Sequence, residues 1–129
     1  MQFPEYRGRR LRKNDHFRRL IRETRLSVDD LVYPLFAVSG RDIKKPIASM
    51  PGQFQLSVDH LVKEARAAFE LGIPAILLFG IPAKKDEQGT GAFAADGIVQ
   101  QAVKKIKHEL PDLLIVTDVC LCEDRKSVG

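Results

Sequence analysis

Three apolar runs along the chain have the length and composition of buried β-strands. The run at residues 31–38 reads LVYPLFAV, the run at residues 75–79 reads AILLF, and the third begins at residues 113–116 and continues through residues 117–121. Continuous runs of strand-forming residues are typical of strands buried on both faces. Pro34 predicts an edge position or a bulge in the first run, because proline donates no ladder hydrogen bond.

Apolar residues at helical spacing separate these runs. The first helix is expected to begin after Ser57 and to end at Gly72 and Pro74, and the second to begin after Asp96 and to end at Pro111. Their apolar stripes are Leu61, Val62, Ala65, Ala68 and Phe69, then Val99, Ala102, Val103, Ile106 and Leu110. Near the N-terminus, Asn14 or Asp15 can cap a short helix that carries Phe17, Leu20 and Ile21.

One helix between successive strands is the pattern of βαβ units in a parallel sheet. The connections that follow the first two strands are long, at residues 39–56 and 80–95, whereas two or three residues lead from each helix into the next strand. Functional sites of α/β folds lie at the carboxyl ends of the strands, where these long connections would gather. Gly89 and Gly91 in the second connection lack the third glycine of a phosphate-binding loop, and we interpret them as part of a plain flexible loop.

Composition narrows the class of protein. A chain of 129 residues with 44% hydrophobic and 29% charged residues can form one globular domain with a core. The sequence contains neither an apolar run long enough for a membrane span nor a signal peptide. Two cysteines cannot make a disulfide framework, which favours a reducing, cytoplasmic location.

The positive charge is concentrated in an N-terminal arm. Residues 1–25 contain nine basic and three acidic residues, so they carry a charge of +6 within a chain whose net charge is +4. Such an arm can contact nucleic acid, but it holds few aromatic residues and no nucleic-acid motif follows. Packing on a partner subunit is the preferred interpretation, since arginine forms bidentate pairs with interface carboxylates.

The third strand carries the clearest candidate chemistry. Side chains alternate along a strand, so Asp118, Cys120 and Cys122 are predicted to share one face at its carboxyl end. Two thiolates suit zinc, although a catalytic zinc site usually has three protein ligands, and buried cysteines with a packing role are the alternative. The C-x-C spacing differs from the C-x-x-C of redox proteins. The histidines, His16, His60 and His108, are expected at helix surfaces rather than at this site.

Taken together, several motifs resemble one family. They are RGRRLRKN (7–14), SMPG (49–52), LFGIP (78–82), KDE-x-G (85–89) and TDVCLCE (117–123). The chain resembles the N-terminal part of the porphobilinogen synthases, also called 5-aminolevulinate dehydratases. This resemblance implies an α/β fold of the (β/α)8 TIM-barrel class, of which the chain holds the N-terminal arm (1–26), about three strands with two helices (27–123) and a divergent tail (124–129).

The resemblance also implies a reaction and its partners. The family condenses two molecules of 5-aminolevulinate to porphobilinogen for tetrapyrrole and heme synthesis, using two Schiff-base lysines. Its arm embraces a neighbouring subunit, usually in a homo-octamer, which argues against nucleic acid and membrane partners. Cys120 and Cys122 match two of three cysteine ligands for Zn²⁺, and Asp118 matches a residue that lines the substrate pocket. The relevance of the family's allosteric Mg²⁺ is left open by the sequence.

The resemblance ends at Glu123. The family continues with a tyrosine and a T-x-H-G-H-C-G stretch that supplies the third cysteine, whereas this chain continues with DRKSVG. The Schiff-base lysines belong to later strands, so no lysine here matches them, and Lys84 and Lys85 are expected to be solvated in a loop. We therefore expect a truncated form without dehydratase activity of its own. The alternatives are a non-catalytic fragment that docks on full-length subunits and a small C-x-C metal-binding module.

Overall fold

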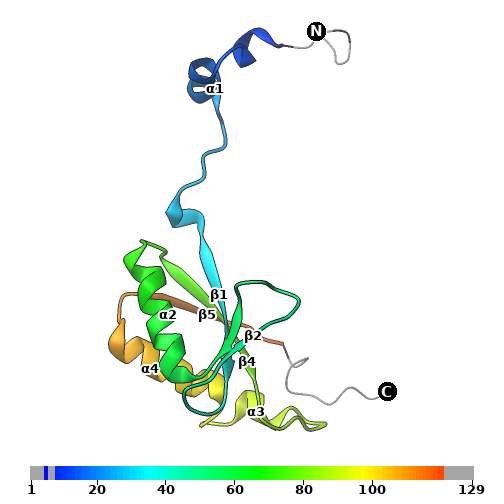
Figure 1. Cartoon of the computed structure of the whole chain (residues 1–129), viewed down its shortest axis with the longest axis vertical. Helices are drawn as coiled ribbons and strands as arrows, with labels where there is room; N and C mark the ends of the chain where they lie inside the picture. Colours follow the sequence, from blue (N-terminus) through cyan, green and yellow to red (C-terminus); the bar gives the residue numbers. More distant parts are fainter. Residues whose placement is uncertain (1–4, 6–7, 121–129) are drawn as a thin grey trace.

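The fold is built on one five-stranded sheet. The computed structural model describes residue 5 and residues 8–120, and its strands are β1 (Val32–Val38), β2 (Lys44–Pro46), β3 (Phe54–Leu56), β4 (Ala75–Ile81) and β5 (Leu114–Thr117). Their order across the sheet is β2-β3-β1-β4-β5, and every pairing is parallel except that of β2 with β3. The three predicted strands are therefore confirmed as parallel neighbours, β1, β4 and β5 (Figure 1).

The long connection expected at residues 39–56 contains two strands that were not predicted, β2 and β3. Each has three residues, and β2 is Lys-Lys-Pro, so neither shows the apolar run by which a buried strand is recognised. The links from helix to strand, residues 71–74 and 110–113, are also slightly longer than expected.

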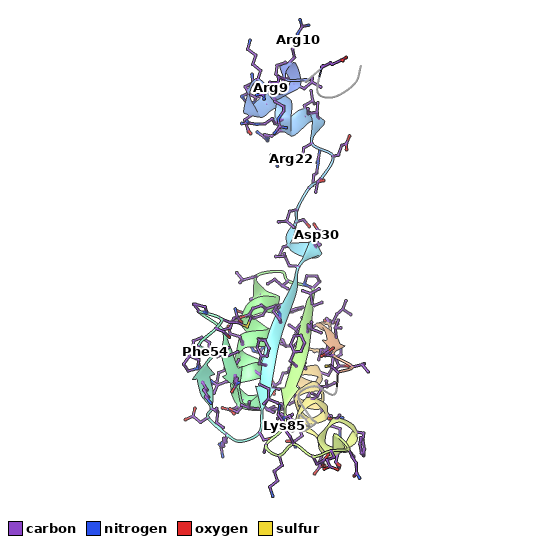
Figure 2. The ribbon with its side chains drawn as sticks, turned by 90° about the vertical axis from the view of Figure 1, so that its right-hand side faces the viewer. Arg9, Arg10, Arg22, Asp30, Phe54 and Lys85 are labelled. Atoms are coloured by element: carbon purple, nitrogen blue, oxygen red, sulfur yellow. The ribbon has the colours of Figure 1, made fainter. Side chains whose placement is uncertain are left out.

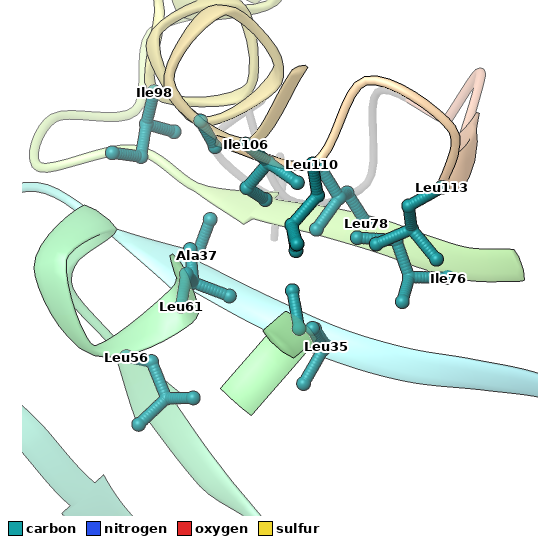
Figure 3. Packing of buried hydrophobic residues seen from close by; sticks show 12 residues of the cluster. Leu35, Ala37, Leu56, Leu61, Ile76, Leu78, Ile98, Ile106, Leu110 and Leu113 are labelled. Carbon is teal, nitrogen blue, oxygen red and sulfur yellow. The ribbon is translucent and has the colours of Figure 1, made fainter. Parts of the chain in front are cut away.

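Two helices, α2 (Val58–Glu70) and α4 (Ile98–Glu109), pack side by side against the sheet (Figure 1). The buried side chains that join them to the strands lie between the two layers in Figure 3. From the strands they are Leu35, Ala37, Leu56, Ile76 and Leu78, and from the helices and the link before β5 they are Leu61, Ala65, Ile98, Ala102, Ile106, Leu110 and Leu113. These are mostly residues of the predicted apolar runs and stripes.

The boundaries of α2 and α4 agree with the sequence at three of the four expected signals, since α4 also ends before Pro111 as predicted. Ser57 is the N-cap residue of α2, and the chain leaves this helix at Gly72, which has a φ of +85°. Asp96 is not the N-cap of α4, contrary to the prediction, because Gly97 takes that position without a side-chain cap. A Cβ at residue 97 would lie 2.6 Å from the Gly91 carbonyl oxygen, so glycine fits where the chain turns into the helix.

Pro34 lies in the first half of β1, where this strand is paired with β4 on one side only. Along its whole length β1 pairs with β4, but its pairing with β3 is confined to Phe36 and Ala37. The predicted edge position is thus confirmed for the first half of the strand.

One face of the sheet and its two outer strands are uncovered in the described part of the chain. Val32, Leu114 and Val116 are 51%, 61% and 47% exposed, although they are large apolar residues within strands. The outer strand β2 carries Lys44 and Lys45, which discourage pairing with another chain, whereas β5 consists of Leu-Ile-Val-Thr. The sheet therefore leaves an apolar face bare in the described part of the chain.

The N-terminal arm stands away from the sheet and helices (Figure 1). It contains the short 3₁₀ turn η1 (Arg10–Arg12) and the helix α1 (Asp15–Ile21), and a second turn, η2 (Val28–Asp30), leads from it into β1. Asn14 caps α1 as predicted, since its Oδ1 accepts a hydrogen bond of 3.0 Å from the Phe17 amide. Figure 2 shows Arg9, Arg10 and Arg22 along this arm. No helix in the described residues is long and apolar enough to cross a membrane.

Candidate functional site

Asp118 and Cys120 lie together at the carboxyl end of β5. The amide of Asp118 donates a 3.3 Å hydrogen bond to the Leu78 carbonyl, which keeps the chain beside β4 after the last strand residue, Thr117. Both residues line a cavity of about 490 Å³ that is also bordered by Phe79 and Gly80 at the end of β4. A volume of this size is typical of small-molecule sites.

The structure brings two of the three predicted site residues to one cavity, and their roles stay a prediction. Asp118 and Cys120 face the same cavity at the carboxyl edge of the parallel strands, where the sequence placed them. β5 ends at Thr117, so the expected continuation of the strand through residue 121 is wrong for residues 118–120. Cys122 lies outside the described residues, and its place on the same face stays a prediction.

Two phenylalanines form an aromatic surface next to this edge. Phe36 and Phe79 are paired in the register of β1 and β4, and their rings stack with centroids 5.3 Å apart and planes 19° from parallel. Phe79 also lines the cavity. The cavity therefore combines an aromatic wall with the Asp118 carboxylate and the Cys120 thiol, a combination that can hold a small molecule with an apolar body and a polar end.

The loop between β4 and α4 is held in shape by Asp86. Its Oδ1 accepts hydrogen bonds of 3.0 Å from the amides of Gln88 and Thr90, and these contacts, that of Thr90 foremost, lower the pKa of Asp86. Gly89 follows the turn with a φ of +67°, and the short helix α3 (Thr90–Phe93) begins directly after it. The plain flexible loop predicted at Gly89 and Gly91 is thus a built turn, and an aspartate three residues before a glycine is the signal that marks it.

Gln100 is a further cavity residue that sequence reasoning missed. It lies in the first turn of α4, lines the cavity, and donates a 2.8 Å hydrogen bond from Nε2 to the Ala92 carbonyl oxygen of the loop. A glutamine on a helix carries no sequence signal for such a contact, because its partner is set by the path of the loop.

A second group of ligand-type side chains lies at the start of α2, apart from this cavity. The Nε2 atom of His60 is 2.8 Å from Oδ1 of Asp42 and 3.8 Å from Oδ2 of Asp59. One ligand atom from each residue lies within 4.8 Å of the other two, so the group could hold a metal ion. The buried Ser57 hydroxyl donates to Asp59 Oδ1 at 2.7 Å, and this bond is the main cause of the lowered pKa of Asp59.

The sequence did not predict this group. His60 was expected at a helix surface, and it does lie in α2, but Asp42 is 18 residues away and reaches it through the turn between β1 and β2. His16 and His108 lie exposed in α1 and α4, as expected. Lys84 and Lys85 are exposed in the loop after β4, also as expected (Figure 2).

Comparison with known proteins decides the family. The family model described as delta-aminolevulinic acid dehydratase matches residues 5–127. The chain belongs to the delta-aminolevulinic acid dehydratase family. Curated dehydratases of this name are 55% identical over 121 residues in Synechocystis sp. and 53% identical over 123 residues in Methanothermus sociabilis. These alignments cover 94% and 95% of this chain but 37% and 38% of the two relatives.

A solved structure from the dehydratase family has the same arrangement. The porphobilinogen synthase of Toxoplasma gondii, solved in complex with the reaction product porphobilinogen, matches with a TM-score of 0.87 and 34% identity. The match covers 98% of this chain and 35% of that protein. The expected α/β fold and the family resemblance are therefore confirmed, and the chain spans a little over a third of the length of the dehydratases it matches.

Proposed function

We propose that this chain supplies part of the active site of a 5-aminolevulinate dehydratase, which condenses two molecules of 5-aminolevulinate to porphobilinogen. The observation that carries the proposal is the shared cavity of Asp118 and Cys120 in a chain of this family. Asp118 would line the substrate pocket, where its carboxylate can orient the substrate amine or pass protons. The aromatic ring of Phe79 supports the proposal as an apolar wall for the carbon chain.

Zn²⁺ is the cofactor we propose, held by Cys120 and Cys122. The thiol of Cys120 fits this role because it is only partly buried and borders the cavity beside Asp118. When bound, zinc supplies Lewis-acid polarisation of a substrate oxygen. The chain has two cysteines in all, so a third cysteine ligand is absent from it and weak zinc binding is expected.

The 129-residue chain by itself is proposed to be catalytically inactive. The family's Schiff-base lysines belong to strands beyond the matched stretch, and a lysine amine is required to activate the keto group of the substrate. Incubation of the purified chain with Zn²⁺ and 5-aminolevulinate should yield no porphobilinogen. Turnover at the rate of a full-length dehydratase would contradict this part of the proposal.

Zinc binding tests the cysteine site directly. Titration of the reduced chain should show zinc bound to thiolate, and Cys120→Ser should abolish that signal. Zinc held by Asp42, Asp59 and His60 would persist in Cys120→Ser and disappear in His60→Gln, so the two variants separate the two groups. A thiolate signal that survives Cys120→Ser would show that this cysteine is not a ligand.

The arm is proposed to pack on another dehydratase subunit, as in a homo-octamer, in the cytoplasm. Leu20 and Leu26 are each 80% exposed on an arm whose net charge is +6, which favours a partner surface that is apolar and acidic. The exposed leucines and the net charge of +6 on the arm also favour the second candidate, a non-catalytic chain that docks on full-length subunits. Co-purification with a full-length dehydratase, lost on removal of the arm, would support docking, and a monomeric chain that captures no subunit would contradict both.

A further inference from the structure

One wall of the cavity beside Asp118 and Cys120 is made of backbone rather than side chains. Gly91 and Ala92, both within the short helix α3, border the cavity directly. Residues with so little side chain cannot anchor themselves by packing, so their position depends on hydrogen bonds to neighbouring elements. The bond that reaches them from α4 is the one from Gln100 Nε2 to the Ala92 carbonyl oxygen.

The oxygen of the Gln100 side-chain amide destabilises the fold at this position. Its Oε1 is buried and accepts no hydrogen bond from the described residues. An unsatisfied buried acceptor costs about 1–3 kcal/mol, so a mere packing role would be served better by an apolar side chain. The hydrogen bond from Gln100 Nε2 to the Ala92 carbonyl oxygen is therefore the contact that accounts for a glutamine at this position.

Gly97 is fitted to this amide from the opposite side. A Cβ on Gly97 would collide with Oε1 of Gln100 and would lie 2.6 Å from the Gly91 carbonyl oxygen. Gly97 thus leaves the space in which the amide and the loop backbone meet. Three features converge here: the donor on Ala92, the buried acceptor, and the absence of a side chain at residue 97.

The next residue along α4 provides a comparison within the same helix. Gln101 also donates from Nε2 to a carbonyl oxygen of the loop, that of Asp96. Gln101 is exposed and does not border the cavity, whereas Gln100 does. Both glutamines attach the loop to α4. Of the two hydrogen bonds, only that of Gln100 reaches a residue of the cavity wall.

We propose that Gln100 is a positioning residue of the candidate site, which fixes the Gly91–Ala92 backbone as the wall against which a small keto amino acid binds beside Asp118. The inference rests on the proposed function and adds a residue to it. Gln100 does not contact the reacting atoms; it acts through the loop backbone.

Matched substitutions of the two glutamines test this role. Gln100→Met keeps the length and flexibility of the side chain but removes the donor, and Gln101→Met makes the same change outside the cavity. In the reduced full chain, 5-aminolevulinate affinity is measured by NMR titration and amide hydrogen exchange is followed at Gly91 and Ala92. Gln100→Met should weaken binding roughly tenfold and speed exchange at both amides, while Gln101→Met leaves affinity within about twofold.

A second variant keeps the test decisive if Gln100→Met does not fold. Gly97→Ala retains the glutamine but displaces its amide, so it should also weaken binding and speed exchange at Gly91 and Ala92. If the unaltered chain binds 5-aminolevulinate and every folded variant of the two binds it equally well, the inference is overturned while the proposed function stands. If the unaltered chain does not bind 5-aminolevulinate, the proposed site itself fails, and the role of Gln100 in it fails with it.

Discussion

Two single side chains, those of Ser57 and Asp86, fix loops near the ends of strands by accepting hydrogen bonds from loop amides. Ser57 and Asp86 do so at two different loops, and neither carries a role that residue type alone would reveal. Ser57 was predicted as an N-cap, and it occupies that position, but its hydroxyl accepts a 2.8 Å hydrogen bond from the Ile43 amide instead of capping the helix. The place of Asp118 at the cavity was predictable because the residue comes at the carboxyl end of a buried apolar strand, whereas its role stays a prediction.

Replacing Ser57 by alanine should destabilise the fold by about 1–3 kcal/mol, because the Ile43 amide and Asp59 Oδ1 both lose their hydroxyl partner. Urea unfolding monitored by circular dichroism measures the change. Ser39→Ala, a change of the same kind just after β1, is the control. An unchanged midpoint for Ser57→Ala would show that the buried hydroxyl contributes nothing.

Asp86 should make the stability of the chain depend on pH in the acid range. Its pKa is lowered in the folded state, foremost by the Thr90 amide, so its contribution is present above the unfolded-state pKa and is lost as pH falls through the folded-state pKa. Asp86→Asn should therefore be less stable than the original chain near neutral pH, and the difference should shrink on acidification. Urea unfolding across a pH series checks this, and a constant difference at every pH would contradict it.

The elements were predictable where one physical pattern repeats over many residues. The apolar runs at residues 31–38 and 75–79 and the stripes of α2 and α4 each extend over five or more residues, and all four elements are present. Short elements carry no such pattern: β2 is polar and three residues long, and it exists because β3 lies beside it. The group of Asp42, Asp59 and His60 was missed for the same reason, since a turn brings its members together.

Gly80 shows how tightly β4 and α4 are matched. A Cβ at residue 80 would collide with Val99 of α4, whose Cγ2 faces the strand. Gly80→Ala should cost about 1–3 kcal/mol through overpacking, and Val99→Ala introduced in the same chain should recover part of that loss. Thermal unfolding of the single and double variants measures the coupling. Additive effects of the two substitutions would mean that a clash with Val99 is not the cause of the destabilisation by Gly80→Ala.

At the scale of the whole molecule, an arm, a two-helix layer and an open sheet form one chain that spans 37% of its Synechocystis relative. Apolar side chains meet solvent on the uncovered face of the sheet and on the arm, and also at scattered positions such as Leu71 and Phe93. The sequence indicated both, through the +6 arm and the number of strands. Neither surface contributes to the core between sheet and helices, so each is available to a partner.

Removal of residues 1–26 should leave the stability of the remaining chain within about 0.5 kcal/mol, because the arm stands apart from the core residues. Urea unfolding of the shortened chain measures this, and a large loss of stability would show that the arm supports the fold. The same shortened chain should lose its association with dehydratase subunits.

The central claim is that the carboxyl edge of β4 and β5 forms part of a site for 5-aminolevulinate, with Asp118 in its wall. NMR mapping of 5-aminolevulinate on the isotope-labelled chain tests it most directly, with Asp118→Asn as the variant and Asp112→Asn, just before β5, as the control. The account predicts shift changes centred on Phe79, Gly80 and residues 117–120 that Asp118→Asn abolishes and Asp112→Asn leaves intact. Changes centred on the arm or on His60, or binding unaffected by Asp118→Asn, would contradict it.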